Sequence, residues 1–156
     1  MEDWKHLPLD LPGVDAGLPL SQPPAGYELV REWALSTTAQ LRTLRHELAS
    51  QIAEHEVGGL HELTGTPKAL VLIATELASN ALVHGLPPTM VRLSRREDRW
   101  MLDVGDHDPE SAPVYAGARI RGEGGLGLHL ARQLSQEVGW YATERTKNVW
   151  ATFAVR

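Results

Sequence analysis

The spacing of apolar residues changes along the chain from a helical period to a strand period, and this change constrains the fold most. In residues 39–57 apolar positions recur every three or four residues, as on one face of a helix, and residues 67–84 repeat that pattern. In residues 89–106 apolar and polar side chains alternate on either side of the polar stretch 96–99, which is typical of a β-hairpin. The sequence therefore predicts two consecutive helices followed by two paired strands.

Three further strands and one further helix are expected around this unit. Residues 27–35 alternate enough for a strand, and residues 139–144 and 149–155 close the chain with two more. A third helix is expected at residues 126–138, where it follows a glycine-rich loop. We expect a mixed, mostly antiparallel sheet with the helices on one face, which is an α+β two-layer sandwich.

The length of 156 residues suits one domain, and a proline-rich segment precedes it. Residues 1–26 contain five of the ten prolines, a density that excludes a regular helix. We expect residues 1–26 to form a flexible or extended arm, whose leucines could dock on the domain or on a partner, and residues 27–156 to form the domain. The prolines of the arm are Pro8, Pro12, Pro19, Pro23 and Pro24.

Composition and charge exclude several classes of function. The formal net charge of -5 leaves no basic excess for gripping phosphate backbones, so we expect no direct binding of nucleic acid. The absence of cysteine excludes disulfides, thiolate catalysis and cysteine zinc sites. No apolar run reaches the roughly 20 residues of a membrane span, and the N-terminus lacks a secretory signal pattern, so a cytoplasmic protein is expected.

Polar residues in three segments stand out as candidates for a binding site. Glu76, Asn80 and His84 are spaced four residues apart, which places them along one flank of the second helix. Asp106 ends a predicted strand, and the glycine-rich stretch 122–127 leads into a helix N-terminus, where free N–H groups favour phosphate. Each feature alone also has an ordinary reading as a solvated helix face, a loop carboxylate or a simple turn.

In their order and spacing, these segments resemble the histidine-kinase-like (GHKL) ATPases, whose ATP-binding domain has the Bergerat fold. More narrowly, the chain resembles the small stand-alone regulators related to anti-sigma-factor serine/threonine kinases. TELASNALVHG is similar to the N box of that family, and GDHDP lies where its first glycine box, D-x-G, is expected. GGLGLHLARQL is similar to the second glycine box, and TKNVWATFAV to the closing strand. The resemblance covers residues 27–156.

The resemblance implies a role for each matching residue. Asn80 is expected to coordinate the Mg²⁺ that bridges the ATP phosphates, and an amide oxygen is a suitable hard ligand for that ion. Glu76 is expected to act as general base, Asp106 to accept a hydrogen bond from the adenine amino group, and Thr152 to help close the adenine pocket. The residues expected to lie against the phosphates are Gly125, Leu126, Gly127 and Leu128.

Other parts of the resemblance leave alternatives open. Residues 107–123 would form the nucleotide lid, in which Arg119 and Arg121 would meet phosphate or a partner, or remain solvated. His84 either belongs to the site or only packs and forms hydrogen bonds at the helix end. Asp108 replaces the glycine of D-x-G, and a negatively charged side chain there would crowd the adenine edge or repel phosphate.

An alternative alignment of the first glycine box uses Asp103 with Gly105, a true D-x-G. We prefer Asp106 because Asp103 lies inside the predicted strand, whereas Asp106 is followed by the loop that begins before Pro109.

The resemblance predicts a protein serine/threonine kinase that binds ATP and Mg²⁺. It would sequester a sigma factor and phosphorylate a hydroxyl of an antagonist protein, and it would form a homodimer. The alternative is a non-catalytic partner-switching module with weak or no ATP binding. The intact Glu76 favours the kinase, and Asp108 favours the module.

Overall fold

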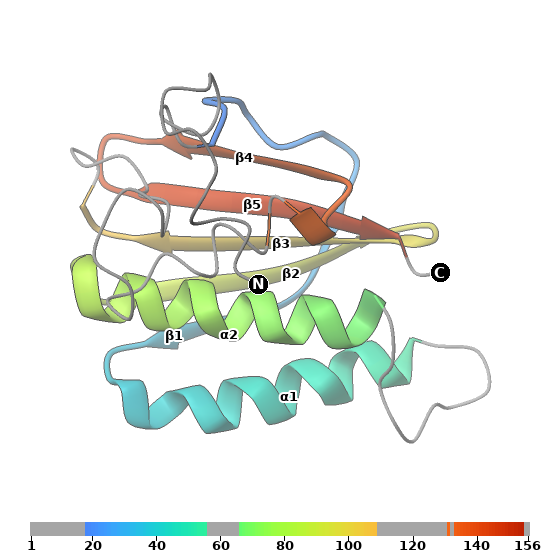
Figure 1. The fold of residues 1–156 in the computed structure, drawn as a ribbon, viewed down its shortest axis with the longest axis horizontal. Coiled ribbons are helices and arrows are strands. Elements are labelled where there is room, and N and C mark those ends of the chain that lie inside the picture. Colours follow the sequence, from blue (N-terminus) through green and yellow to red (C-terminus); the bar gives the residue numbers. More distant parts are fainter. Residues whose placement is uncertain (1–17, 56–65, 109–130, 132, 155–156) are drawn as a thin grey trace, which may run out of the picture.

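A five-stranded sheet forms one layer of the molecule (Figure 1). The computed structural model describes residues 18–55, 66–108, 131 and 133–154. The strands lie in the order β1-β2-β3-β5-β4, and each is antiparallel to its neighbours. They are β1 (Glu28–Leu35), β2 (Thr89–Arg96), β3 (Arg99–Asp106), β4 (Glu137–Ala142) and β5 (Lys147–Ala154).

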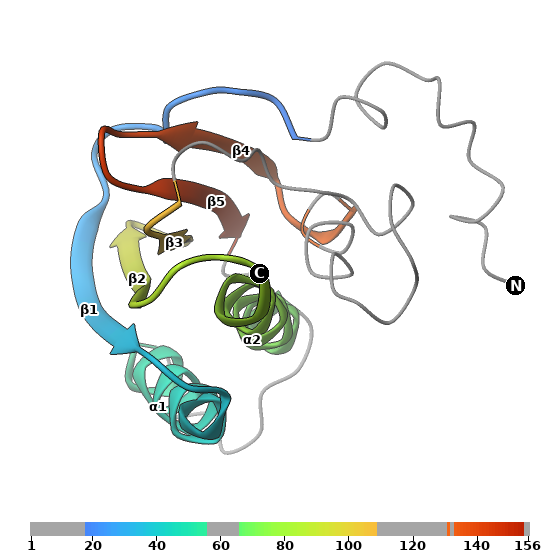
Figure 2. The same ribbon diagram turned by 90° about the vertical axis from the view of Figure 1, so that its left-hand side faces the viewer.

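Among the described residues, two helices form the second layer, and both cover the same face of the sheet (Figure 2). They are α1 (Leu41–Glu54), which follows a short 3-10 turn at Thr38–Gln40, and α2 (Thr66–His84). This arrangement confirms the predicted α+β two-layer sandwich. The expected parallel component is limited, in the described residues, to an isolated bridge between Leu20 and Trp140.

The hydrophobic core fills the space between the two layers. On β3 every second side chain, from Trp100 through Leu102 to Val104, belongs to the core. Because side chains alternate along a strand, Asp106 also points toward the helices, whereas Asp103 points to the opposite face. The helices contribute buried residues at helical spacing, namely Leu44, Leu48 and Ile52 of α1 and Leu70, Ile73, Ala74 and Leu77 of α2.

Residues 18–26, the end of the predicted arm, pack on the domain, which is one of the two alternatives that the sequence left open for its leucines. Leu18 is buried in the core at 3% exposure. The backbones of Pro19 and Ser21 exchange two hydrogen bonds of 2.9 Å with Trp140, which covers the outer edge of β4. The indole N–H of Trp150 also donates to the Ser21 carbonyl at 2.8 Å. The rest of the predicted arm, residues 1–17, lies outside the described residues.

The end of the third predicted helix differs from the sequence prediction. Ala131, Gln133 and Leu134 are helical, but β4 already begins at Glu137, so the predicted end at residue 138 is too late. Gly139 explains why this strand packs closely, since a Cβ at this position would lie 2.6 Å from Ser21 Oγ and 2.9 Å from the Trp150 ring. Residues 126–130 of this helix lie outside the described residues.

None of the helices in the described part of the chain combines the length and the apolar character that crossing a bilayer requires.

Replacing Leu18 by alanine should lower the free energy of unfolding by about 2–5 kcal/mol, because it removes buried methyl groups from the core. Leu20→Ala is the matched control, because Leu20 is 70% exposed and lies two residues away. Urea denaturation of both variants provides the measurement. Equal stabilities of the two variants would contradict the docking of residues 18–26.

Candidate functional site

The polar stripe of α2 lies at the border between its buried and its exposed faces. Glu76 and Asn80 are partly exposed and His84 is exposed, whereas Leu77 and Ala78 between them are buried. The apolar positions of α2 are fixed against the sheet, so the stripe is held at one side of the helix layer. The spacing expected from the sequence is therefore present in the fold.

The side-chain oxygen of Asn80 is buried and has no hydrogen-bond partner in the described structure. Leaving a buried acceptor unpaired costs about 1–3 kcal/mol, and native proteins rarely leave one so. A ligand that supplies a donor or a cation would satisfy this oxygen. Amide oxygens are suitable ligands for Mg²⁺, so the observation fits that ion at this position.

Asp106 lies directly beside the end of α2, because Gly85 leaves space for it. A Cβ at Gly85 would lie 2.4 Å from Asp106 Oδ2 and 2.8 Å from the Ala81 carbonyl oxygen. We call the place where the end of α2 meets the end of β3 the corner. Two hydrogen bonds of His107 hold it together: its backbone N–H donates to the Leu86 carbonyl at 2.9 Å, and its Nδ1–H donates to the Pro88 carbonyl at 2.9 Å. The C-terminal end of the stripe and the end of β3 therefore lie side by side.

The Asp106 carboxylate is 4% exposed and already has polar neighbours. The backbone N–H of Asp108 donates to its Oδ1 at 2.8 Å, and Lys147 Nζ lies 3.6 Å from its Oδ2. Burial raises the pKa of Asp106, while the Asp108 N–H and the Lys147 charge oppose that rise. A carboxylate acceptor of this kind can receive a hydrogen bond from an amino group, provided that Lys147 leaves a lone pair available.

Asp103, the alternative first-box residue, lies on the other face of the sheet. Tyr141 Oη and Asn148 Nδ2 each donate to its carboxylate at 2.7 Å. Gly105 packs beside the same amide, since a Cβ there would lie 2.3 Å from Asn148 Nδ2. The structure thus brings Asp106, and not Asp103, to the end of α2.

Thr152 is also on the face of β5 that points away from the helices. Its neighbours Ala151 and Phe153 belong to the core, so alternation along the strand turns Thr152 outward. It is fully buried there, and its Oγ1 accepts the Glu137 backbone N–H at 3.2 Å. The structure therefore does not bring Thr152 together with Asp106, contrary to the expected place in the adenine pocket.

The sequence analysis did not identify three residues of this corner as part of the candidate site, namely Gly85, Thr89 and Lys147. Gly85 would be noticed only as a helix terminator, and Lys147 reaches Asp106 through the pairing of β3 with β5, which no local pattern encodes. Thr89 begins β2 beside the end of β3, where Met90 pairs with Gly105, and its Oγ1 is buried without a partner in the described structure.

Several predicted site residues lie outside the described residues. These are the second-glycine-box residues Gly125, Leu126, Gly127 and Leu128, and the lid beyond Asp108 with Arg119 and Arg121. Within the described residues, no group of three or more His, Asp or Glu side chains is arranged to hold a metal ion.

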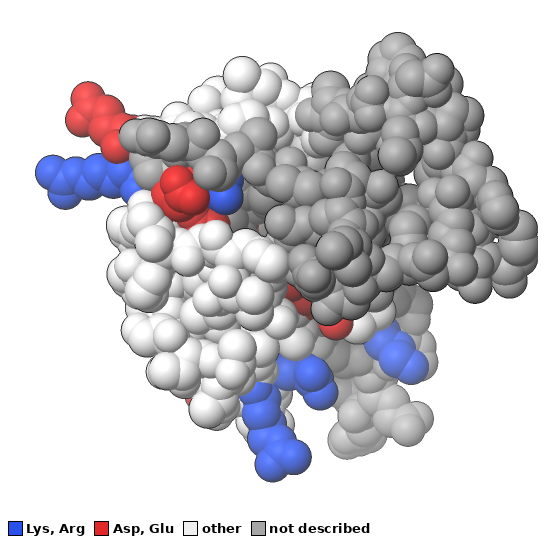
Figure 3. All heavy atoms as spheres, turned by 60° about the vertical axis from the view of Figure 1, so that its left-hand side comes forward, with Lys and Arg blue, Asp and Glu red and all other residues white. Residues whose placement is uncertain are grey.

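Charged side chains are interspersed on the face at this end of the molecule. Figure 3 shows acidic and basic groups close together, and the described part of this face has no continuous basic surface.

The model of the histidine kinase-like ATPase domain family matches residues 34–153, which is most of the chain. The match includes both helices and strands β2 to β5. A comparison with curated proteins found no significant match.

Replacing Asp103 by asparagine should reduce the dependence of stability on pH. Burial raises the pKa of Asp103 most strongly, against the lowering effects of Tyr141, Asn148 and Arg92. The folded protein therefore keeps a proton on this carboxyl above the unfolded-state pKa of about 3.9, and stability falls as pH rises through the folded-state pKa. Because asparagine cannot ionise, the Asp103→Asn variant should lose less stability than wild type as pH rises.

Urea midpoints measured at several values between pH 4 and pH 7 would test this expectation. Asp98→Asn, in the exposed turn between β2 and β3, is the matched control. If the urea midpoints of the Asp103→Asn variant and of wild type decrease equally as pH rises, the raised pKa of Asp103 is wrong.

Proposed function

Because the chain belongs to the histidine kinase-like ATPase domain family, we propose that it binds Mg²⁺·ATP at the corner formed by α2 and β3 and transfers the γ-phosphate to a protein hydroxyl. The family match confirms the resemblance to the histidine-kinase-like ATPase superfamily, and it indicates ATP binding. The observation that carries the proposed site is the buried Asn80 Oδ1, which has no partner in the described structure. It lies one helical turn from Glu76 on the same flank.

Asn80 is the residue that would hold the magnesium ion, which neutralises phosphate charge during phosphoryl transfer when it is bound. The described residues offer no cluster of carboxylates for this ion. Magnesium commonly takes few protein ligands and completes its shell with phosphate oxygens and water, so one amide oxygen is compatible with the site.

Glu76 is proposed to act as the general base. Its carboxylate is partly exposed, so a hydroxyl of a substrate protein can approach it. As that oxygen forms its bond to the γ-phosphorus and the bond to the ADP oxygen breaks, the hydroxyl proton passes to Glu76.

Asp106 is proposed to accept a hydrogen bond from the adenine amino group. Its carboxylate lies between Gly85 and Lys147 on the helix-facing side of the sheet. A guanine base would direct a carbonyl oxygen toward this carboxylate, and two acceptors repel each other. Asp106 would therefore favour ATP over GTP.

The proposed biological setting follows the resemblance to anti-sigma-factor serine/threonine kinases. The protein would sequester a sigma factor and phosphorylate an antagonist protein, and it would act as a homodimer. Contact with nucleic acid is not part of the proposal, which agrees with the net charge of -5.

A second function, a non-catalytic partner-switching module, is favoured by the surroundings of Asp106. Asp108 stands in place of a glycine, and both oxygens of Asp106 already have polar neighbours. Calorimetric titration with ATP, with and without Mg²⁺, separates the two functions. Magnesium-dependent binding supports the kinase, and no binding at millimolar ATP supports the module.

Replacing Asn80 by alanine should remove the magnesium-dependent part of ATP affinity, a loss of about tenfold or more, because the amide oxygen is the proposed metal ligand. Calorimetry gives the affinity, and circular dichroism checks that the fold is intact. Ser79→Ala, one residue away and also partly exposed, should bind as wild type does. Unchanged magnesium dependence in Asn80→Ala would contradict the metal site.

Replacing Glu76 by glutamine should preserve ATP affinity and slow the chemical step by about 10²–10⁴-fold, since the amide cannot accept the proton. The rate is measured as slow ATP hydrolysis, in which water replaces the protein hydroxyl and ADP is released. A variant that turns over as fast as wild type would exclude Glu76 as the base. A variant that loses ATP affinity instead would show that Glu76 serves binding.

A further inference from the structure

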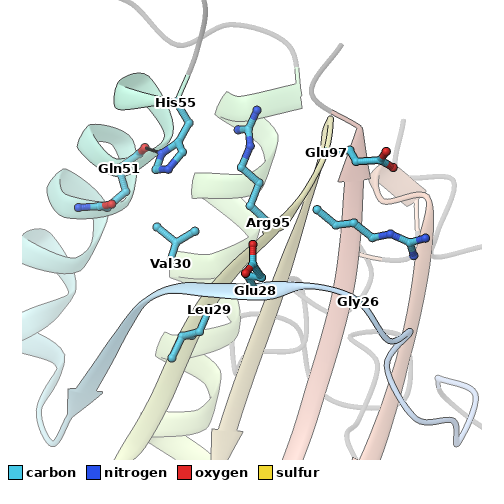
Figure 4. Close-up of a pocket in the computed structure, with 9 residues that line it drawn as sticks. Gly26, Glu28, Leu29, Val30, Gln51, His55, Arg95 and Glu97 are labelled. Carbon is cyan, nitrogen blue, oxygen red and sulfur yellow. Dashed lines mark hydrogen bonds between the residues drawn. The ribbon is translucent and has the colours of Figure 1, made fainter.

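A pocket of about 840 Å³ lies at the opposite end of the sheet from Asp106. Figure 4 shows it between the start of β1, the end of α1 and the β2–β3 hairpin. Its lining includes Glu28, Val30, Gln51, His55, Arg95 and Glu97. The volume lies within the usual range for small-molecule sites. Six residues of extended strand, about 20 Å, separate this end of β3 from Asp106, so the pocket is distinct from the proposed nucleotide site.

Arg95 is held in place by the core. Its guanidinium carbon lies 4.7 Å from the centroid of the Trp100 ring, and Trp100 is fully buried. Stacking of a guanidinium on an indole is a favourable contact that fixes the orientation of the charged group. The planar head of Arg95 is therefore set in advance at one wall of the pocket.

Arg95 is the cross-strand neighbour of Glu28, but its guanidinium forms no ion pair within the described structure. Its Nη1 is buried without a hydrogen-bond partner, and none of the ion pairs among described residues includes it. An unpaired charged donor in a buried position is costly, because it loses water without gaining an acceptor. An anion in the pocket would remove that cost, and a guanidinium binds a carboxylate through two parallel hydrogen bonds.

His55 approaches the same aromatic ring from the opposite wall. Its ring meets Trp100 edge-on, with centroids 5.3 Å apart and planes at 86°. Its Nδ1–H donates to the Gln51 carbonyl at 2.9 Å, so Nε2 is the nitrogen that can interact with a ligand. In Figure 4 His55 and Arg95 extend toward the pocket from α1 and β2 respectively.

The remaining lining restricts the charge and shape of the ligand. Glu28 and Glu97 are exposed in the pocket wall, and they would repel a doubly charged phosphate more strongly than a singly charged carboxylate. Leu29 and Val30 add apolar surface for a hydrocarbon body. Arg96 donates to the Ala25 carbonyl at 3.2 Å and is engaged by the N-terminal segment.

We propose that this pocket binds a small monocarboxylate with an apolar body, whose carboxylate pairs with Arg95 and whose hydrocarbon part contacts Val30. The Trp100 ring supports Arg95 from beneath and His55 closes the opposite side. This site requires no nucleotide, and it stands whether or not the nucleotide site is catalytic.

Titration of the ¹⁵N-labelled protein with sodium butyrate, in the absence of nucleotide, tests the proposal by the chemical shift of the Trp100 indole N–H. A saturable shift is expected, since the indole underlies the arginine that the carboxylate would contact. Sodium chloride at equal ionic strength and inorganic phosphate are the comparison titrations. Butyrate should bind more tightly than phosphate, and chloride should give no saturable shift.

Three arginine variants provide the controls. Arg95→Ala should weaken butyrate binding about tenfold or more, and Arg95→Lys should weaken it less, because the charge remains but the planar fork is lost. Arg99→Ala alters an exposed arginine of the same hairpin that does not line the pocket, and it should bind as wild type does. If Arg95→Ala fails to fold, Arg95→Lys and the phosphate comparison still decide. The proposal is overturned by an unsaturable shift, by equal affinity in Arg95→Lys and Arg99→Ala, or by tighter binding of phosphate.

Discussion

The contact between Gly85 and the Asp106 carboxylate joins the helix layer to the sheet at the place where the proposed nucleotide site lies. A side chain at residue 85 would overlap Oδ2, so only glycine allows the end of α2 to approach the end of β3 so closely. The bonds of His107 to Leu86 and Pro88 then hold the intervening turn against the strand. The stripe of Glu76 and Asn80 is useful for binding because this corner fixes its distance from Asp106.

Strand alternation decides which acidic residue belongs to that corner. Asp103 and Asp106 are three residues apart, so they lie on opposite faces of β3. Asp103 receives hydrogen bonds from Tyr141 and Asn148, which complete a polar cluster away from the helices. Asp106 instead shares the helix-facing side with the core residues Val104 and Leu102, where burial raises its pKa and Lys147 opposes that rise.

Local patterns in the sequence predicted the described strands, the two helices and their two-layer arrangement, because helical and strand periods are short-range signals. The spacing of Glu76 and Asn80 was predictable for the same reason. Contacts across the sheet were not, since the pairing of Asp106 with Lys147 and the outward turn of Thr152 depend on strand register. Docking of the arm's leucines on the domain was one of the alternatives that the sequence left open. The prolines of the segment suggest only the absence of a helix and do not show which surface Leu18 covers.

The polar atoms that the fold buries without partners identify both proposed sites by the same physical argument. Among the described residues these atoms are Asn80 Oδ1, Thr89 Oγ1, Arg95 Nη1 and Trp100 Nε1. Asn80 and Thr89 belong to the end of the molecule where β3 finishes, and Arg95 and Trp100 belong to the hairpin end. Between them the helix-facing side of the sheet is apolar. Because unpaired buried polar groups lower stability, Asn80 Oδ1 at one end and Arg95 Nη1 at the other support the two proposed ligand sites.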